Sequence, residues 1–350
     1  MLRPVRRAVT WRRFGVLALW LSMVACALQI QACLTGPAAR RPLSQPVRLK
    51  VLVLPSLSSA PLFVAADGGY FAAQGLDVDF VKVTRSTDAL LALSRRELDV
   101  WTGSVSLGLL NAIGRDAGIR IVSDRGFMAP AGCAYGALVV RRLLVERHQV
   151  NRPADLRGRR VALNPSSTPG YLTERLLGQA GLGLGDITVV DLPEGAVIAE
   201  ALRSGSVDAA FVLEPWVTLV QQSGSALVLA PAGQVAPGYQ HLVTAYGPSL
   251  LTGDPDPGRR FMAAYLNALR QYDEGKTARN LEILARRTGL DEELVRTACW
   301  PSVRGDGRLD TDSMLAFQSW GLKKHFLDRE LTPAQLWDSS FVDHANQARR

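Results

Sequence analysis

Residues 60–83, APLFVAADGGYFAAQGLDVDFVKV, predict a short apolar helix that is followed by a β-strand. Pro61 suits the first turn of a helix, where its missing N–H would have no partner, and Ser58 or Ser59 can cap the free amides. Gly75 is a typical C-terminal stop, and the valine- and phenylalanine-rich run after it is typical of a strand. This order of helix, stop and strand is half of a βαβ unit.

The same pattern occurs again about 110 residues later. KVLVLPSLSSAP, from Lys50, and RVALNPSSTPGY, from Arg160, each run an apolar strand into a Pro-Ser-rich loop and a helix. ALLALSRRELDVWTGS and AEALRSGSVDAAFVLEP then run a helix into a strand that begins at Asp99 or Asp208, with nearly the same offset. Unrelated βαβ units reuse these residue types, so chance is the alternative. The constant offset favours an internal repeat, and we expect two α/β lobes.

Length and charge narrow the class of protein. The 350 residues are 47% hydrophobic, enough to bury substantial cores, and the length favours two domains or lobes. The formal charge is +8, but residues 1–50 hold nine basic and no acidic residues, so residues 51–350 sum to −1. A nucleic-acid-binding fold would carry basic residues on its surface. We therefore expect no nucleic-acid partner.

The N-terminal segment has the layout of a secretory signal peptide. Arginines precede an apolar run at 14–28, in which only Ser22 is strongly polar, and this run is shorter than the roughly 20 residues that span a bilayer. Cys26 and Cys33 each follow a small residue, as in the lipobox of bacterial lipoproteins, and either could be lipidated. We expect a signal peptide at 1–33, removed on export, and a proline-containing tether at 34–46.

The remaining cysteines and the histidines give no sign of a metal or cofactor site. Cys133 and Cys299 could pair in an exported chain, but the sequence does not place them within reach, and we predict two unpaired structural residues. The histidines lack the spacing of zinc ligands: they are His148, His241, His325 and His344. No G-x-S-x-G, P-loop or H-E-x-x-H motif occurs. We expect no metal and no cofactor.

Four segments together carry a family resemblance. APLFVAADGGYFAAQGLDVDFVKV, ALSRRELDVWTGS, ADLRGRRVALNPSST and ALRSGSVDAAFVLEPW, in this order, resemble the substrate-binding proteins of ABC importers of the nitrate, sulfonate and taurine type, which share the fold of the NMT1/THI5-like group. The resemblance runs from Val47 to the C-terminus, where DGRLDTDSMLAFQSW fits the family's helical tail.

The resemblance implies a fold and a function. The fold would be α/β, a two-lobed periplasmic binding protein of type II with a hinge and a helical C-terminal tail. The first lobe would comprise residues 47–136 and 244–350, and the second 137–243. Such a chain is an exported, lipid-anchored, monomeric receptor that captures a small-molecule solute and delivers it to an ABC permease and its ATPase. It is not an enzyme.

The expected ligand site lies beyond the carboxyl ends of the strands, where loops lead into helices. The candidate residues are Ser56, Ser58, Ser59, Trp101, Thr102, Gly103, Ser104 and Arg125 in the first lobe, and Asn164, Ser166, Ser167, Thr168, Glu214 and Trp216 in the second. Arg125 could clamp a carboxylate or sulfonate, and Glu214 could pair with an amine or a heterocyclic N–H. The alternatives are helix capping for the serines, core packing for the tryptophans, and surface or salt-bridged charges for Arg125 and Glu214.

The solute remains open among sulfonates, nitrate, carboxylates, amines and pyrimidines. The loop PSLSSAP lacks the aromatic, Asn-rich segment of thiamine-precursor receptors, which disfavours a thiamine-type pyrimidine. Pyrimidine synthases of this fold depend on a Cys-rich cluster, which the sequence lacks. The alternatives to a transport receptor are a membrane-tethered sensor or chaperone and, with less support, a pyrimidine-synthase-like enzyme.

Overall fold

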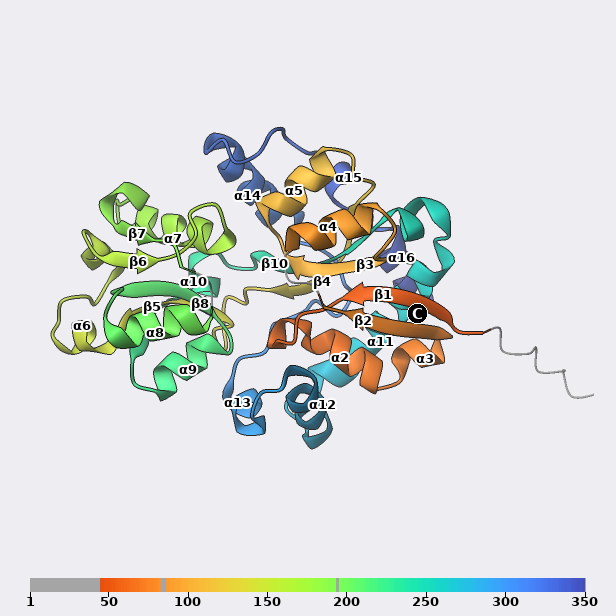
Figure 1. The fold of residues 1–350 in the computed structure, drawn as a ribbon, viewed down its shortest axis with the longest axis horizontal. Coiled ribbons are helices and arrows are strands. Elements are labelled where there is room, and N and C mark those ends of the chain that lie inside the picture. Colours follow the sequence, from red (N-terminus) through yellow and green to blue (C-terminus); the bar gives the residue numbers. More distant parts are fainter. Residues whose placement is uncertain (1–44, 83–85, 193–194, 350) are drawn as a thin grey trace, which may run out of the picture. The chain divides into compact units, whose positions relative to one another are not determined.

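A computed structural model describes residues 45–82, 86–192 and 195–349 of the chain (Figure 1). Pro46–Arg350 form one compact unit, which contains both β-sheets and all the apolar cores of the described residues. The predicted signal peptide, most of the tether, and Cys26 and Cys33 lie outside the described residues. Within the described ranges, no helix has the length and apolar character needed to cross a membrane.

The first sheet has the strand order β2-β1-β3-β10-β4. Its strands are β1 (Val47–Leu52), β2 (Leu76–Val81), β3 (Val100–Ser104), β4 (Arg120–Phe127) and β10 (Gln240–Tyr246). β1 pairs in parallel with β2 and β3, whereas β10 is antiparallel to both β3 and β4. β10 therefore enters this sheet from a much later part of the chain.

The second sheet repeats this arrangement with the order β7-β6-β8-β5-β9. Its strands are β5 (Gly136–Arg141), β6 (Arg160–Ala162), β7 (Thr188–Val190), β8 (Ala209–Leu213) and β9 (Ala226–Pro231). β5 takes the antiparallel position that β10 has in the first sheet. The two expected α/β lobes are thus confirmed, and they share one topology.

The repeat extends to single hydrogen bonds. The backbone N–H of Lys50 donates to Oδ2 of Asp99 over 2.9 Å, and the N–H of Arg160 donates to Oδ2 of Asp208 over 3.0 Å. These aspartates precede β3 and β8 and hold them against β1 and β6, respectively. Asp99 and Asp208, which occupy equivalent positions in the sequence repeat, therefore each accept a backbone N–H of the adjacent parallel strand.

The chain crosses between the lobes twice. The first crossing joins β4 to β5 and the second joins β9 to β10, with α10 (Ala232–Val235) between them. The boundary expected between residues 243 and 244 falls inside β10, so the second crossing lies earlier, before Gln240. The predicted boundary therefore assigns the first residues of this strand to the wrong lobe.

Helices cover both faces of each sheet (Figure 1). On one face of the first sheet, the shared apolar core includes α2 (Ala60–Asp67), α3 (Tyr70–Ala73), α11 (Asp256–Asp273), α12 (Ala278–Thr288), α13 (Glu292–Thr297) and α16 (Ser340–Gln347). The other face carries α4 (Ser86–Ser94), α5 (Leu107–Gly114), α14 (Thr311–Lys323) and α15 (Pro333–Leu336). The helical C-terminal tail is confirmed.

The second sheet lies between α7 (Thr168–Gln179) with α10 on one face and α8 (Ala196–Ser204) with α9 (Trp216–Gln222) on the other. α6 (Arg142–Glu146) follows β5, and the short turns are η1 (Leu57–Ser59), η2 (Pro153–Leu156), η3 (Leu184–Asp186) and η4 (Ser249–Gly253). α14 also bridges the lobes, because Trp320 Nε1 and Lys324 Nζ donate to the carboxylate of Glu174 on α7 over 2.7 and 2.6 Å.

The stretch at 60–83 differs from its prediction in two details. The helix ends at Asp67 and a separate turn of helix, α3, follows Gly69, whose φ of +77° breaks the run. Gly75, with φ +65°, ends α3 as expected. Ser59 occupies the N-cap position of α2 without capping it, because its hydroxyl accepts the N–H of Leu54 over 3.2 Å instead. The serine thus fixes the loop that precedes the helix.

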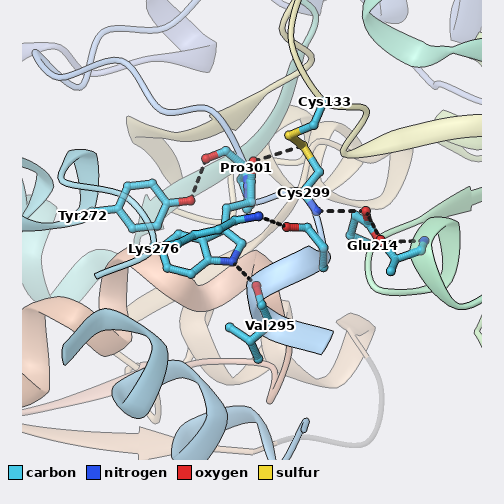
Figure 2. Close-up of a disulfide and its surroundings, with 10 residues drawn as sticks. Cys133, Glu214, Tyr272, Lys276, Val295, Cys299 and Pro301 are labelled. Atoms are coloured by element: carbon cyan, nitrogen blue, oxygen red, sulfur yellow. Dashed lines mark hydrogen bonds between the residues drawn. A yellow bond between two sulfur atoms is a disulfide. The ribbon is translucent and has the colours of Figure 1, made fainter. Parts of the chain in front are cut away.

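The prediction of two unpaired cysteines was wrong. Cys133, in the first crossing, forms a disulfide with Cys299, which follows α13, and their Cα atoms are 5.6 Å apart (Figure 2). The two residues are 166 positions apart in the sequence, so their proximity depends on how the C-terminal segment packs beside the first crossing. Local sequence pattern carries no information about such a contact.

Candidate functional site

A cavity of about 280 Å³ lies at the carboxyl ends of the parallel strands of both sheets. The first lobe lines it with the loop after β1, the end of β3 and the start of β10, and the second lobe with the starts of α7, α8 and α9 and the end of β8. Tyr135 contributes from the first crossing. Ligands of open parallel sheets bind at this edge.

The loop between β1 and α2 forms the hydroxyl-bearing wall. Ser56 and Ser58 both line the cavity, and their hydroxyl oxygens are 2.7 Å apart, within hydrogen-bond distance. Ser59, which was also predicted as a ligand contact, is buried behind them on the N–H of Leu54. The carbonyl of Ser58 accepts a hydrogen bond from Nη1 of Arg125. This loop is therefore held by the hydrogen bond from the Leu54 N–H to the Ser59 hydroxyl and by the guanidinium of Arg125.

Ser104 and His241 complete the first-lobe side. Ser104 Oγ, at the end of β3, lies 3.5 Å from Nε2 of His241, at the start of β10. His241 is buried, and burial together with the positive charge of Arg125 lowers the pKa of its imidazole to about 3. The neutral ring can donate from one nitrogen and accept at the other. At neutral pH this wall therefore offers hydroxyls and an uncharged imidazole.

Arg125 places a positive charge beneath this wall. Its side chain is 1% exposed, forms no ion pair with any described residue, and leaves its Nε without a partner. It lies behind Ser58 and does not line the cavity, so the structure does not show the direct clamp that the sequence suggested. A buried charge acts strongly on its surroundings, because the protein interior screens it poorly, although the buried carboxylate of Asp124 offsets part of the charge of Arg125. The wall above Arg125 therefore favours a negatively charged group.

Glu214 forms the opposite, second-lobe wall. It is 6% exposed and lines the cavity at the end of β8. Its carboxylate accepts hydrogen bonds from the N–H and hydroxyl of Thr218, over 3.0 and 2.8 Å, and from the N–H of Cys299, over 2.9 Å. Burial raises the pKa of Glu214, while these hydrogen bonds and the nearby Lys276 oppose the rise. The alternative of a solvated surface charge is excluded.

The segment around Cys299 belongs to the first lobe and fixes the orientation of Glu214 (Figure 2). Lys276 Nζ donates to the carbonyl of Ala298 over 2.8 Å, and Tyr272 Oη donates to the carbonyl of Pro301 over 2.7 Å. The disulfide to Cys133 adds a covalent tie to the first crossing. The Cys299 N–H that donates to Glu214 is thus part of a tightly held segment, and this hydrogen bond connects the two lobes at the cavity wall.

Trp216 closes the second-lobe side at the start of α9. Its indole lies so close to Gly195 that a side chain on that residue would have little room: a Cβ there would lie 3.1 Å from the indole Nε1. Gly195 also has φ +84°, which favours glycine. Trp216 therefore lies in the cavity wall with its indole packed against Gly195, and its contact with a ligand stays a prediction.

The remaining predicted residues of β3 do not reach the cavity. Trp101 is buried in the apolar core, where its indole packs over Gly103. Thr102 donates its hydroxyl to the carbonyl of Leu52 over 2.6 Å, and Gly103 pairs with Val243 in the sheet. β3 is a central strand that is covered on both faces, so only its last residue, Ser104, emerges at the edge.

The loop before α7 is polar but uses its polar groups internally. Asn164 Oδ1 accepts the N–H and the hydroxyl of Ser166 over 2.9 and 2.8 Å, and Ser167 caps α7 by accepting the N–H of Gly170 over 3.3 Å. Thr168 donates to the carbonyl of Val105 in the first lobe over 3.0 Å. None of these four predicted residues lines the cavity, and Pro169 is the member of this region that does.

Sequence reasoning missed Tyr135, His241 and Phe211 as cavity residues. His241 was considered only as a metal ligand. It begins a strand that runs antiparallel to its neighbours, so its N-terminal end lies at the carboxyl edge of the sheet. That topology, had it been recognised, would have pointed to His241. Among the residues with described placement, no three potential metal ligands lie close enough together to hold an ion.

Comparison with known families and sequences gives a consistent result. The family model described as NMT1/THI5 like matches residues 56–272. The chain is also similar to the taurine-binding periplasmic protein of Escherichia coli (strain K12), with 25% identity over 254 residues, which cover 70% of this chain and 74% of that protein.

Solved structures share the fold at lower identity. The alkanesulfonate-binding protein SsuA from Xanthomonas axonopodis pv. citri, bound to MOPS, superposes with a TM-score of 0.66 and 20% identity, covering 85% of this chain and 100% of that one. The desulfurization enzyme DSZB superposes with a TM-score of 0.66 and 18% identity, covering 87% and 100%. The fold of these structures therefore occurs both in binding proteins and in an enzyme.

Proposed function

The chain belongs to the NMT1/THI5-like family, and we propose that it is a receptor that captures a small solute between its two lobes for delivery to an ABC-type importer. The observation that carries this proposal is the cavity itself. It lies at the carboxyl edges of two sheets of identical topology, and both lobes contribute polar side chains to it. Its volume of about 280 Å³ suits a small molecule.

The charges around the cavity suggest the chemistry of the solute. The first-lobe wall offers Ser56, Ser58 and Ser104 above the buried charge of Arg125, which favours an anionic group such as a sulfonate or carboxylate. The second-lobe wall offers the carboxylate of Glu214, which favours a cationic or N–H-bearing group. A solute with both groups, such as a small amino-sulfonate, would match both walls. The name of the taurine-binding relative agrees with this chemistry.

Two features favour a receptor over an enzyme. The two cysteines in the described part of the chain are joined in a disulfide, and neither lines the cavity. Burial and Arg125 hold His241 neutral, which makes it a weak proton acceptor at neutral pH. Ser104 and His241 both line the cavity with Oγ and Nε2 3.5 Å apart, but an imidazole with so low a pKa is a poor general base for that hydroxyl. The likeness to the desulfurization enzyme DSZB therefore reflects the shared fold.

We place this receptor outside the cytoplasm, held to the membrane by a lipid on Cys26 or Cys33. The relative from Escherichia coli is named a periplasmic protein, and the N-terminal pattern of arginines, apolar run and cysteine fits export with lipid modification. The partners would be a permease and its ATPase, with a monomeric receptor. Mass spectrometry of the mature N-terminus tests the anchor, and retention of Met1 would contradict it.

A thermal-shift screen of the purified protein against amino-sulfonates, alkanesulfonates, nitrate, carboxylates, amines and pyrimidines tests the function. A ligand at 100 times its dissociation constant stabilises the fold by about 2.7 kcal/mol. Glu214→Gln should weaken binding of an amine-bearing hit, whereas the exposed Glu200→Gln, on α8, should leave it unchanged. Chemical conversion of the hit by the protein alone would refute a receptor, and equal binding to both variants would refute the assigned role of Glu214.

A further inference from the structure

We propose that a basic groove between α3, α11 and α16 is a second binding site, which takes the phosphate group of an anionic phospholipid headgroup. The groove is distinct from the solute cavity, since no residue lines both. It has a volume of about 460 Å³, and α3 and α16 both pack against α11 to form it. Its floor and rim include Arg259, Arg260, Arg270 and Arg349.

The positive charge of the groove exceeds its negative charge. Among the described lining residues, Asp256 is the one carboxylate, and it pairs with Nε of Arg260 over 2.9 Å. Arg259 and Arg270 form no ion pair with any described residue; Arg270 donates only to the amide oxygen of Asn267, over 3.3 Å. The guanidinium groups of Arg259 and Arg270 are therefore not neutralised by an ion pair with any described carboxylate.

Like charges also oppose each other within the groove. Arg349 donates to the carbonyl of Gly305 over 2.9 Å, which draws its side chain toward the fold. Partial burial, with the positive charge of Arg270, lowers the pKa of Arg349, and the carboxylate of Asp306 opposes the shift. Bringing arginines together costs free energy unless an anion joins them, and guanidinium groups bind phosphate oxygens in a bidentate geometry. A phosphate group in the groove would relieve this repulsion.

The position of the groove indicates a membrane source for that phosphate. Arg260 Nη1 donates to the carbonyls of Gln74 and Gly75 over 3.1 and 3.4 Å, and the carbonyl of Gly75 also accepts the N–H of Val47 over 3.0 Å. Val47 is the first residue of β1, so the groove adjoins the point where the chain enters the fold from its N-terminal segment. The solute cavity lies at the opposite, carboxyl edge of this sheet.

This arrangement favours a lipid as the occupant of the groove. A chain that is tethered to a membrane through residues 1–45 would bring the amino edge of the first sheet, with the groove, toward the lipid surface. The solute cavity would then stay open to the side away from the membrane. Each arginine near an anionic lipid surface is expected to strengthen binding about 5.5-fold, so two unpaired arginines contribute about 30-fold.

Vesicle co-sedimentation of residues 46–350 without the lipid anchor tests the proposal, since this compact unit contains both sheets and their cores. The vesicles are phosphatidylcholine alone or a roughly 3:1 mixture with phosphatidylglycerol. We expect binding to the mixture only, and a roughly 30-fold loss in Arg259→Gln/Arg270→Gln. The matched control, Arg95→Gln/Arg147→Gln, removes the same charge from exposed arginines elsewhere and should bind as the unchanged protein does.

The other outcomes are equally informative. Equal loss in both double variants would mean that overall charge attracts the protein, which overturns the site. Calorimetric binding of inorganic phosphate to the groove, without binding to the mixed vesicles, would overturn the lipid and leave a free anion as the occupant. Affinity for the solute should be the same in both double variants, because the groove residues do not touch the solute cavity. The result is therefore independent of the proposed receptor function.

Discussion

Removing the disulfide between Cys133 and Cys299 should destabilise the fold substantially. The bond closes a loop of 166 residues, and the loss of chain entropy in the unfolded state corresponds to about 5 kcal/mol for a loop of this size. Measured values for native disulfides are typically about 2–4 kcal/mol, because the unfolded chain retains structure. We expect the Cys133→Ser/Cys299→Ser variant to lose a free energy of unfolding within that range.

Urea denaturation of the wild type and of this variant, each with and without reductant, measures the effect. Reductant should lower the midpoint of the wild type toward that of the variant and should leave the variant unchanged. The variant should also bind the solute more weakly, since the segment whose Cys299 N–H donates to Glu214 would no longer be held by the disulfide. Equal midpoints for oxidised and reduced wild type would refute the reasoning, as would alkylation of both cysteines before any reduction.

Three further predictions concern single side chains. His241→Gln should make stability depend less on pH on the acid side, because the pKa of His241 is lowered from 6.5 to about 3 and the folded state therefore stays unprotonated where the unfolded state binds a proton. In urea denaturation the wild type should lose about 2 kcal/mol relative to the variant between about pH 6.5 and pH 5. Parallel pH profiles of the two proteins would contradict this. Ser59→Ala should lower the free energy of unfolding by about 0.5–1.5 kcal/mol in urea denaturation, because the part-buried hydrogen bond from the N–H of Leu54 to its hydroxyl is lost, and an unchanged midpoint would contradict this. Ser167→Ala should lower thermal stability by about 1 kcal/mol through loss of the α7 cap and leave solute affinity unchanged; reduced affinity would instead place Ser167 in the site.

The fold was largely predictable because its rules are local or repeated. Strand, loop, helix and glycine stop recur at 50–83 and 160–192, and the topology of a βαβ unit follows from that order. The lobe boundary near Gln240 was less accessible, since a strand pattern does not say which sheet the strand joins. The disulfide was not accessible at all, because it joins residues that only the packing of the C-terminal segment brings together.

The lining of the cavity was predictable where a residue's place followed from the strand order. Ser56, Ser58, Ser104, Glu214 and Trp216 all line the cavity, because each lies at the carboxyl end of a strand or in the loop that follows it. The symmetry between the two Pro-Ser loops failed as a guide. The loop after β1 presents the hydroxyls of Ser56 and Ser58 to the cavity. In the loop before α7, by contrast, Ser166 hydrogen-bonds within its own turn and Ser167 caps the helix. Sequence shows which polar groups are present but not which of them already have partners.

The position of β10 sets an order in which the chain must complete its two sheets. The second lobe is continuous from β5 to β9, so all five of its strands have been synthesised once Pro231 emerges. The first sheet lacks the strand between β3 and β4 until Tyr246 follows. The lobe that begins the chain is therefore the later one to close, and until then β3 and β4 expose unpaired edges. During synthesis these edges are where a chaperone would protect the chain from aggregation.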